Sequence, residues 1–292
     1  MNLEETTTRF LVVAGLTAII HLINTLIYSV RLAGVKTQRV ATAISLFQVV
    51  FLVASTANLI QAPLMSSIVE HAINAGLKHL NTPDFLTSPF YQEQLAHLRQ
   101  QIRMVILAGT VGTLLGALCI PFFVNFFSRA ILMLEDVGSV PKMFFKMVLS
   151  PFKMVKLVKK SEFSSVNSFW AVLRGPLRIP RYFLLANILI TGIWTIGVLS
   201  ALYAGALLPQ FRSTATLTSG IVNGVAAILA ATVVDPTAAM ITDQAVRGAR
   251  KEADVRQMAI YLAITRFAGT LLAQFFFLPA ASIIRWVAEL IT

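Results

Sequence analysis

The chain has 292 residues, of which 57% are hydrophobic and only 13% are charged. Charged residues make up about a quarter of an average soluble protein, so this composition excludes a soluble globular domain. The formal net charge is +11, but the basic residues gather in particular loops, which argues against nucleic-acid binding as their purpose. The only cysteine, Cys119, lies in an apolar stretch, so a disulfide framework is excluded.

Five stretches contain no Asp, Glu, Lys or Arg and are long enough to cross a bilayer, and a sixth is slightly shorter. A transmembrane helix needs about 20 mainly apolar residues. We therefore predict an all-α integral membrane protein, a polytopic bundle of about six transmembrane helices that forms a single membrane domain over residues 1–292. In chain order, the predicted helices cover approximately residues 9–30, 40–62, 104–127, 182–208, 217–241 and 258–290.

The first predicted helix carries a polar stripe. Thr17, His21, Asn24, Tyr28 and Arg31 follow one another at steps of four and three, so all five lie on one face. Polar groups in hydrocarbon are costly unless they are paired, so the stripe must face other helices or a wet cavity. It either holds the bundle together through hydrogen bonds between helices or forms the polar wall of a substrate path. The ionisable His21 in mid-membrane favours the path.

The second predicted helix carries a looser set of polar residues, namely Ser45, Gln48, Ser55 and Asn58, with Gln61 at its far end. These residues either pack against other helices or line a substrate path, and the sequence favours neither interpretation. We expect the helix to end before Pro63, because proline disrupts a helix interior. Residues 65–80 are amphipathic and residues 91–103 have a helical pattern. We expect both to lie along the membrane surface or to extend the second and third helices.

Glycine pairs and a basic segment follow. The Gly-x-x-x-Gly patterns at Gly112–Gly116 and Gly220–Gly224 predict close helix packing and also permit a homodimer. Residues 128–181 interleave lysines with aromatic and aliphatic residues. This composition predicts interfacial amphipathic helices that contact anionic membrane lipids on the cytoplasmic side.

Two charged residues lie inside the last two spans. Asp235 is about six residues from the cytoplasmic end of the fifth helix, and Pro236 follows it. Arg266 lies at a similar depth in the sixth helix, which we expect to bend or end near Pro279. We therefore infer an Asp235–Arg266 pair, which is either a structural ion pair or a gate. Alternatively, Arg266 extends to the membrane surface along its apolar stem.

The distribution of basic residues predicts the topology. Of the 24 lysines and arginines, 17 lie in the loops after the first, third and fifth helices. Cytoplasmic loops carry an excess of these residues. The sequence therefore predicts a multi-pass protein with both termini outside the cytoplasm.

Enzyme motifs are lacking. The sequence contains no paired-histidine metal motif, no Gly-x-Ser-x-Gly and no phosphate-binding Gly-Lys-Ser loop, and its four histidines do not lie at metal-ligand spacing. We therefore expect no catalytic residue, no metal and no cofactor.

Three local strings resemble the Amj family, bacterial lipid II flippases that can substitute for MurJ. They are residues 21–37 (HLINTLIYSVRLAGVKT), residues 55–63 (STANLIQAP) and residues 234–237 (VDPT) with Thr242-Asp243. The resemblance runs over the whole chain, and it implies an acidic residue where this chain has Asn24 and a basic one where it has Ser55. It further implies transfer of an undecaprenyl-pyrophosphate-linked disaccharide pentapeptide, lipid II, to the outer leaflet of the bacterial cytoplasmic membrane.

A large hydrophilic headgroup needs a polar route, while its lipid tail can stay in the bilayer. Under the family interpretation, the route is lined by His21, Asn24, Tyr28, Gln48, Asn58 and Gln61. Arg31, Lys36 and Arg39 at its cytoplasmic mouth then engage the pyrophosphate through charge-assisted hydrogen bonds. Other classes remain open: a small-solute or ion transporter that uses Asp235 and Arg266, a membrane enzyme acting on a polyprenyl-linked substrate, and a scaffold without transport.

Overall fold

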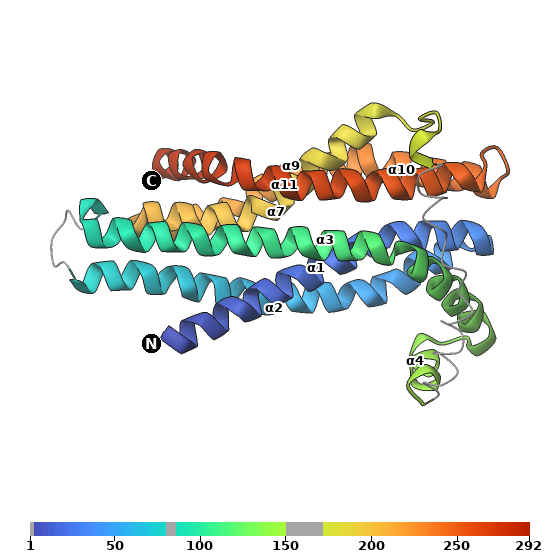
Figure 1. Cartoon of the computed structure of the whole chain (residues 1–292), viewed down its shortest axis with the longest axis horizontal. Coiled ribbons are helices and arrows are strands. Elements are labelled where there is room, and N and C mark those ends of the chain that lie inside the picture. Colours follow the sequence, from blue (N-terminus) through green and yellow to red (C-terminus); the bar gives the residue numbers. More distant parts are fainter. Residues whose placement is uncertain (1–2, 80–85, 150–171) are drawn as a thin grey trace.

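The computed structural model describes residues 3–79, 86–149 and 172–292, and the regular elements of these residues are all helices (Figure 1). Six helices of this part of the chain are long and apolar enough to cross a membrane, so the predicted polytopic helical membrane protein is confirmed. Five spans are α1 (Leu3–Thr37), α2 (Val40–His79), α3 (Pro89–Val137), α7 (Arg181–Leu207) and α11 (Glu252–Ile291). The remaining span is built from η2 (Pro209–Phe211), α8 (Arg212–Leu217), α9 (Ser219–Leu229), η3 (Ala230–Val234) and α10 (Asp235–Val246).

The spans form two groups of three. Helix α1 packs on α2 and α3, whereas α7 packs on α9 and α11, and the groups meet where α3 and α1 contact α11. Both chain termini lie at one end of the bundle, together with the end of α2 and the start of α3 (Figure 1); we call this the terminal end. The turns at residues 38–39 and 247–251 and the short helix α4 (Val140–Leu149) lie at the other end, which we call the basic end.

Helices α2 and α3 are longer than the sequence predicted. The prediction that the second helix ends before Pro63 is wrong, because α2 continues through this proline to His79. Residues beyond it, including Met65 and Ile68, are buried in a cluster with α3, which stabilises the extension. With 40 and 49 residues, the two helices span about 60 and 73 Å at 1.5 Å per residue. The alternative that the segments 65–80 and 91–103 extend these helices is therefore the one observed, as far as residue 79 of the first segment.

The fifth span changes its helical geometry just before a proline. Residues Ala230–Val234 form a π-helical turn, and Asp235-Pro236 begins α10. Proline in a helix lacks a donor N–H, and its ring clashes with the carbonyl group four residues earlier. The wider π turn gives that carbonyl group room. In α11, by contrast, Pro279 does not end the helix, which continues to Ile291.

The two glycine pairs have different surroundings. A Cβ atom on Gly112 would lie 2.1 Å from the carbonyl oxygen of Ala18, and one on Gly116 would lie 2.8 Å from that of Leu22. Close packing of α3 on α1 is thereby confirmed. In contrast, a Cβ atom on Gly220 or Gly224 would meet no atom within 4 Å. The homodimer stays a prediction.

The basic segment is described only in part. Helix α4 forms within it, as expected for an amphipathic stretch, and α3 extends into it as far as Val137. Helix α3 stops there because Gly138 takes the left-handed conformation, with φ = 68°, and its N–H group bonds to the carbonyl oxygen of Leu134. Residues 150–171, with four of the predicted interfacial lysines, lie outside the described residues.

Candidate functional site

The polar stripe of α1 turns into the bundle, where each part of it meets a different helix. Near the terminal end, Gln61 of α2 donates a hydrogen bond to the hydroxyl group of Thr17 at 2.5 Å. One turn further, His21 Nδ1 lies 3.3 Å from the hydroxyl oxygen of Thr113 on α3. Gly109 allows this approach, because its missing side chain leaves room for the His21 ring. The stripe therefore faces other helices, as its cost in lipid requires.

Toward the basic end, the stripe connects to the second group of helices. The hydroxyl group of Tyr28 lies 3.4 Å from Asn187 Oδ1 on α7. The Asn187 amide in turn donates to the carbonyl oxygen of Leu262 at 3.0 Å and to Thr265 Oγ1 at 2.8 Å, both on α11. Asn187 is buried, so this network joins three helices inside the membrane and satisfies its polar atoms.

Asp235 forms its ion pair with Arg31, and not with Arg266 as the sequence predicted. The Arg31 guanidinium Nη2 lies 3.5 Å from Asp235 Oδ1, with side chains 13% and 66% exposed respectively. The inferred Asp235–Arg266 pair is therefore wrong. A similar depth inferred from the sequence does not fix the direction in which a side chain leaves its helix. Asp235 at the start of α10 points to α1, whereas Arg266 is on the buried face of α11.

Arg266 is buried in the middle of the bundle. It is 8% exposed, and its Nε atom has no hydrogen-bond partner. Among the described residues, no carboxylate oxygen lies within 4.0 Å of the nitrogen atoms of the Arg266 side chain. A buried cation without a counter-charge is costly, and such groups in membrane spans mark functional sites.

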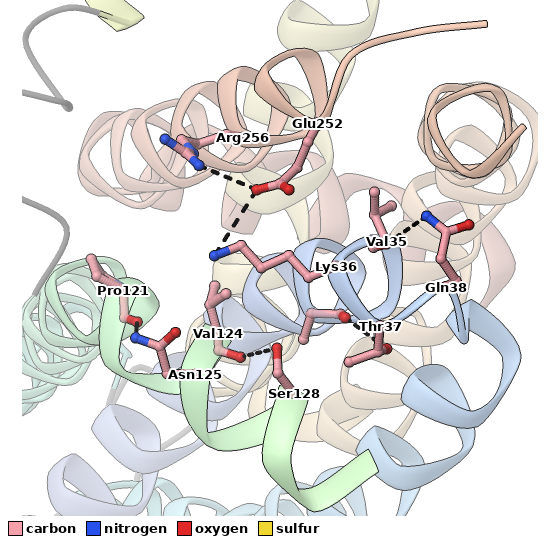
Figure 2. Close-up of polar contacts among 11 residues, drawn as sticks. Val35, Lys36, Thr37, Gln38, Pro121, Val124, Asn125, Ser128, Glu252 and Arg256 are labelled. Carbon is pink, nitrogen blue, oxygen red and sulfur yellow. Dashed lines mark hydrogen bonds and ion pairs between the residues drawn. The ribbon is translucent and has the colours of Figure 1, made fainter. Parts of the chain in front are cut away.

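The predicted cations at the basic end are each held by a carboxylate. Lys36 Nζ extends to Glu252 Oε1 of α11 at 4.0 Å, and Arg256 approaches the same oxygen at 3.2 Å (Figure 2). Arg39 is paired with Glu135 of α3. These side chains are between about a third and two fifths exposed. Exposed ion pairs of this kind contribute only about 0–1 kcal/mol each, so the carboxylates hold these cations weakly.

The comparisons with known proteins agree over nearly the whole chain. A family model described as "Amj: Alternate to MurJ" matches residues 16–288. The lipid II flippase Amj of Bacillus subtilis (strain 168) is 35% identical over 286 residues, which cover 97% of this chain and 98% of that protein. The chain belongs to the Amj family. No solved structure matches it significantly.

In this Amj family member, most of the predicted polar residues of α2 do not converge with the stripe of α1. Gln48 and Asn58 are exposed, on the face of α2 that points away from the bundle. The covered face is instead formed by apolar residues such as Leu46, Phe47 and Ala54. Gln61 is the predicted α2 residue that reaches α1. On α1 itself, Asn24 is half-buried and makes no side-chain hydrogen bond with a described residue.

Sequence reasoning missed the partners of the stripe. Thr113, Asn187 and Thr265 are isolated polar residues in apolar spans, and none of them belongs to a stripe, so helical periodicity does not single them out. A search for single polar residues in mid-span would have found Asn187. The described residues contain no group of three or more His, Cys, Asp or Glu that could hold a metal ion. The expectation that the protein binds no metal still depends on the sequence, in which the histidines do not lie at metal-ligand spacing.

Proposed function

We propose that this protein is a flippase for lipid II, and thus a transporter and not an enzyme. The observation that carries the proposal is the end-to-end match with the lipid II flippase Amj of Bacillus subtilis, which leaves no large part of either chain uncovered. The polar stripe supports it, because a hydrophilic headgroup needs side chains that replace its water inside the hydrocarbon core. The membrane is the bacterial cytoplasmic membrane, with the basic end in the cytoplasm.

The route begins at the basic end. Lys36 and Arg39 bind the pyrophosphate of lipid II by exchanging their carboxylate partners for it. Arg31 follows one to two turns deeper, at 13% exposure, and its partner Asp235 is 66% exposed. The exposed carboxylate stabilises the cation while the site is empty, and phosphate oxygens replace it with shorter, charge-assisted hydrogen bonds.

The route then continues along the stripe. The headgroup passes Tyr28, Asn24 and His21 and leaves near Gln61, while its polyprenyl tail stays in lipid. The Asn24 amide has no hydrogen-bond partner among the described residues, so it offers both a donor and an acceptor to a sugar or peptide group. Gln48 and Asn58 have no part in this route. Helix α4, at the basic end, contacts anionic headgroups.

The membrane potential supplies the driving force in this proposal. The cytoplasm is electrically negative, and the pyrophosphate is an anion, so its outward movement is downhill. Each negative charge gains about 2.3 kcal/mol for every 100 mV. With about two charges, export proceeds without ATP. Flipping in vesicles that stays equally fast when the potential is collapsed would contradict this part of the proposal.

Complementation tests the function. The gene is expressed in a bacterium from which the native lipid II flippase is depleted, and viability is measured. We expect growth with the native chain, and loss of growth with Arg31→Ala at an unchanged protein level. A matched control is Arg247→Ala, because Arg247 is paired with Asp243 on an exposed face of one helix. Failure of the native chain to restore growth, when it is correctly inserted, would remove the proposal.

A further inference from the structure

The two groups of helices run in opposite directions. Helix α1 leads from the terminal end to the basic end, and its counterpart α7, the first helix of the second group, leads back (Figure 1). Because each group has three spans, the second starts on the side where the first finishes. In both groups, the third helix makes a close contact with the first, and the second helix packs at the edge. This arrangement is that of an inverted repeat, as found in many transporters.

The sequence of the third helices supports the repeat. Gly-Thr-Leu-Leu occurs at 112–115 in α3 and again at 269–272 in α11, 157 positions later. Both glycines serve the same contact. Gly112 lies against the backbone of Ala18 in α1, and a Cβ atom on Gly269 would lie 2.6 Å from the carbonyl oxygen of Ile188 in α7. The string therefore has the same place in each half.

The second helices correspond as well. Pro63 of α2 and Pro236 of α10 are 173 positions apart. At the same separation, Ile68 matches Ile241, Glu70 matches Asp243 and Ala72 matches Ala245. The match extends over ten residues, from Pro63 to Ala72, which one shared proline would not explain.

The packing of the bundle follows the same correspondence. The terminal cluster contains Met65, Ile68, Ile102, Val105, Phe277 and Ala281. The basic-end cluster contains their counterparts in the same order, namely Ala238, Ile241, Ala259, Leu262, Ile120 and Val124. Each cluster joins helices of both halves and closes one end of the bundle. An approximate two-fold axis in the membrane plane thus exchanges one closed end for the other.

Arg266 lies between the two clusters. On α11 it comes one turn after Leu262 of the basic-end cluster and two turns before Ala273, which belongs to the terminal cluster with Phe277. Its counterpart on α3, 157 positions earlier, is Gly109, which lies against the His21 ring. The one buried arginine of the described residues is therefore at the centre of the repeat, without a hydrogen-bond acceptor for Nε.

We propose that the chain is an inverted repeat whose terminal and basic-end clusters open alternately, and that Arg266 between them binds the phosphate group of the transported lipid. This proposal rests on the proposed flippase function. Both clusters are apolar and have equivalent positions, so separation of the halves at one end is mirrored by separation at the other. A planar guanidinium group offers donors in the fork geometry that matches phosphate oxygens. The anion supplies the counter-charge that the protein lacks there.

Cross-linking tests the alternate opening. Cysteines replace Val69 and Leu202, which lie in the terminal cluster and line the same hollow of about 300 Å³. At the basic end they replace Val35 and Ala238, one turn beyond the Arg31–Asp235 contact. A control pair within one half, Arg9→Cys with Ser67→Cys, joins groups 2.8 Å apart in α1 and α2. Cys119 is changed to Ala throughout, and a cleavable thiol-reactive linker joins each pair.

Movement of labelled lipid II between vesicle leaflets is measured with each linker in place. We expect either linker between the halves to slow movement at least tenfold, with recovery after cleavage, and the control to change it less than twofold. Full rates with both linkers in place would overturn alternate opening while leaving the flippase function intact. If the protein without a linker moves no lipid, the proposed function itself fails, and this inference fails with it.

Binding measurements test Arg266. The affinity of the purified protein is compared for a polyprenyl pyrophosphate and for the polyprenol of the same length. We expect Arg266→Gln to weaken binding of the pyrophosphate at least tenfold and of the alcohol less than twofold, with Arg266→Lys in between. Arg285→Gln, which removes an exposed arginine paired with Glu289, is the control. Equal changes for both lipids, or none, would show that Arg266 does not hold the phosphate. If Arg266→Gln does not fold, the lysine variant decides.

Discussion

Helices α1 and α2 both carry polar side chains along apolar spans, and the bundle places them in opposite ways. The stripe of α1 is covered by four helices, and Thr17, His21, Tyr28 and Arg31 each meet a polar group on a different one. On α2, which lies at the edge, Gln48 and Asn58 remain exposed. Periodicity shows which residues share a face, but the number of neighbouring helices decides whether that face is covered. Polar residues therefore have different consequences on the two helices.

The largest effect is expected where α1 meets α3 most closely. Gly112→Val places its side chain against the backbone of Ala18, which cannot move without separating the helices. We expect a loss of about 3 kcal/mol or more in the free energy of unfolding. The measurement is thermal or denaturant unfolding in detergent. Gly220→Val is the control, because nothing lies within 4 Å of its Cβ position. Equal stability of the two variants would mean that the α1–α3 contact is not as close as the structure has it.

The next effect concerns the ion pair of α1. Asp235→Asn leaves the largely buried Arg31 without a counter-charge, and we expect a loss of about 1–3 kcal/mol. The exchanged pair, Arg31→Asp with Asp235→Arg, should recover part of the stability that either single change removes. A double-mutant cycle measures the coupling between the two positions. A coupling energy indistinguishable from zero would show that the two side chains act independently.

A smaller effect is expected in the network around Asn187. Asn187→Leu removes three polar contacts that link α1, α7 and α11. Hydrogen bonds between membrane helices contribute about 0.6 kcal/mol each on average, so we expect a loss of about 1–2 kcal/mol. Tyr28→Phe removes only the longest contact, at 3.4 Å, and should cost less than half as much. If Tyr28→Phe were the more damaging of the two, the network would be centred elsewhere.

The smallest effect is expected on the exposed face of α2. Gln48→Leu and Asn58→Leu should each change the free energy of unfolding by less than about 0.5 kcal/mol. Both variants should also support growth in the complementation assay. Gln61→Leu is the matched comparison, because it removes the hydrogen bond to Thr17 and should cost more than either. Loss of growth with Gln48→Leu at normal stability would show that this face of α2 lines the substrate route.

Several features could be predicted from the sequence because they depend on hydrophobicity along the chain. Stretches without charged residues determine the number of spans, since a charge in hydrocarbon has to be compensated. The same rule fixed that the α1 stripe is internal, and the small size of Gly112 and Gly116 indicated the close contact of two helices. Short sequence strings were sufficient to indicate the family, because a family resemblance depends on which residues follow one another in the chain and not on their positions in space.

Only the tertiary structure decided which residues meet. The partner of Asp235 is Arg31 and not Arg266. The rotation of each helix about its own axis selects between them, and that rotation results from the packing of all neighbouring helices together. The same packing leaves Gln48 exposed and stabilises α2 beyond Pro63. It also places Arg266 in the centre of the bundle, between two groups of helices that run in opposite directions. Such relations join residues far apart in the chain, and a pattern within one helix does not contain them.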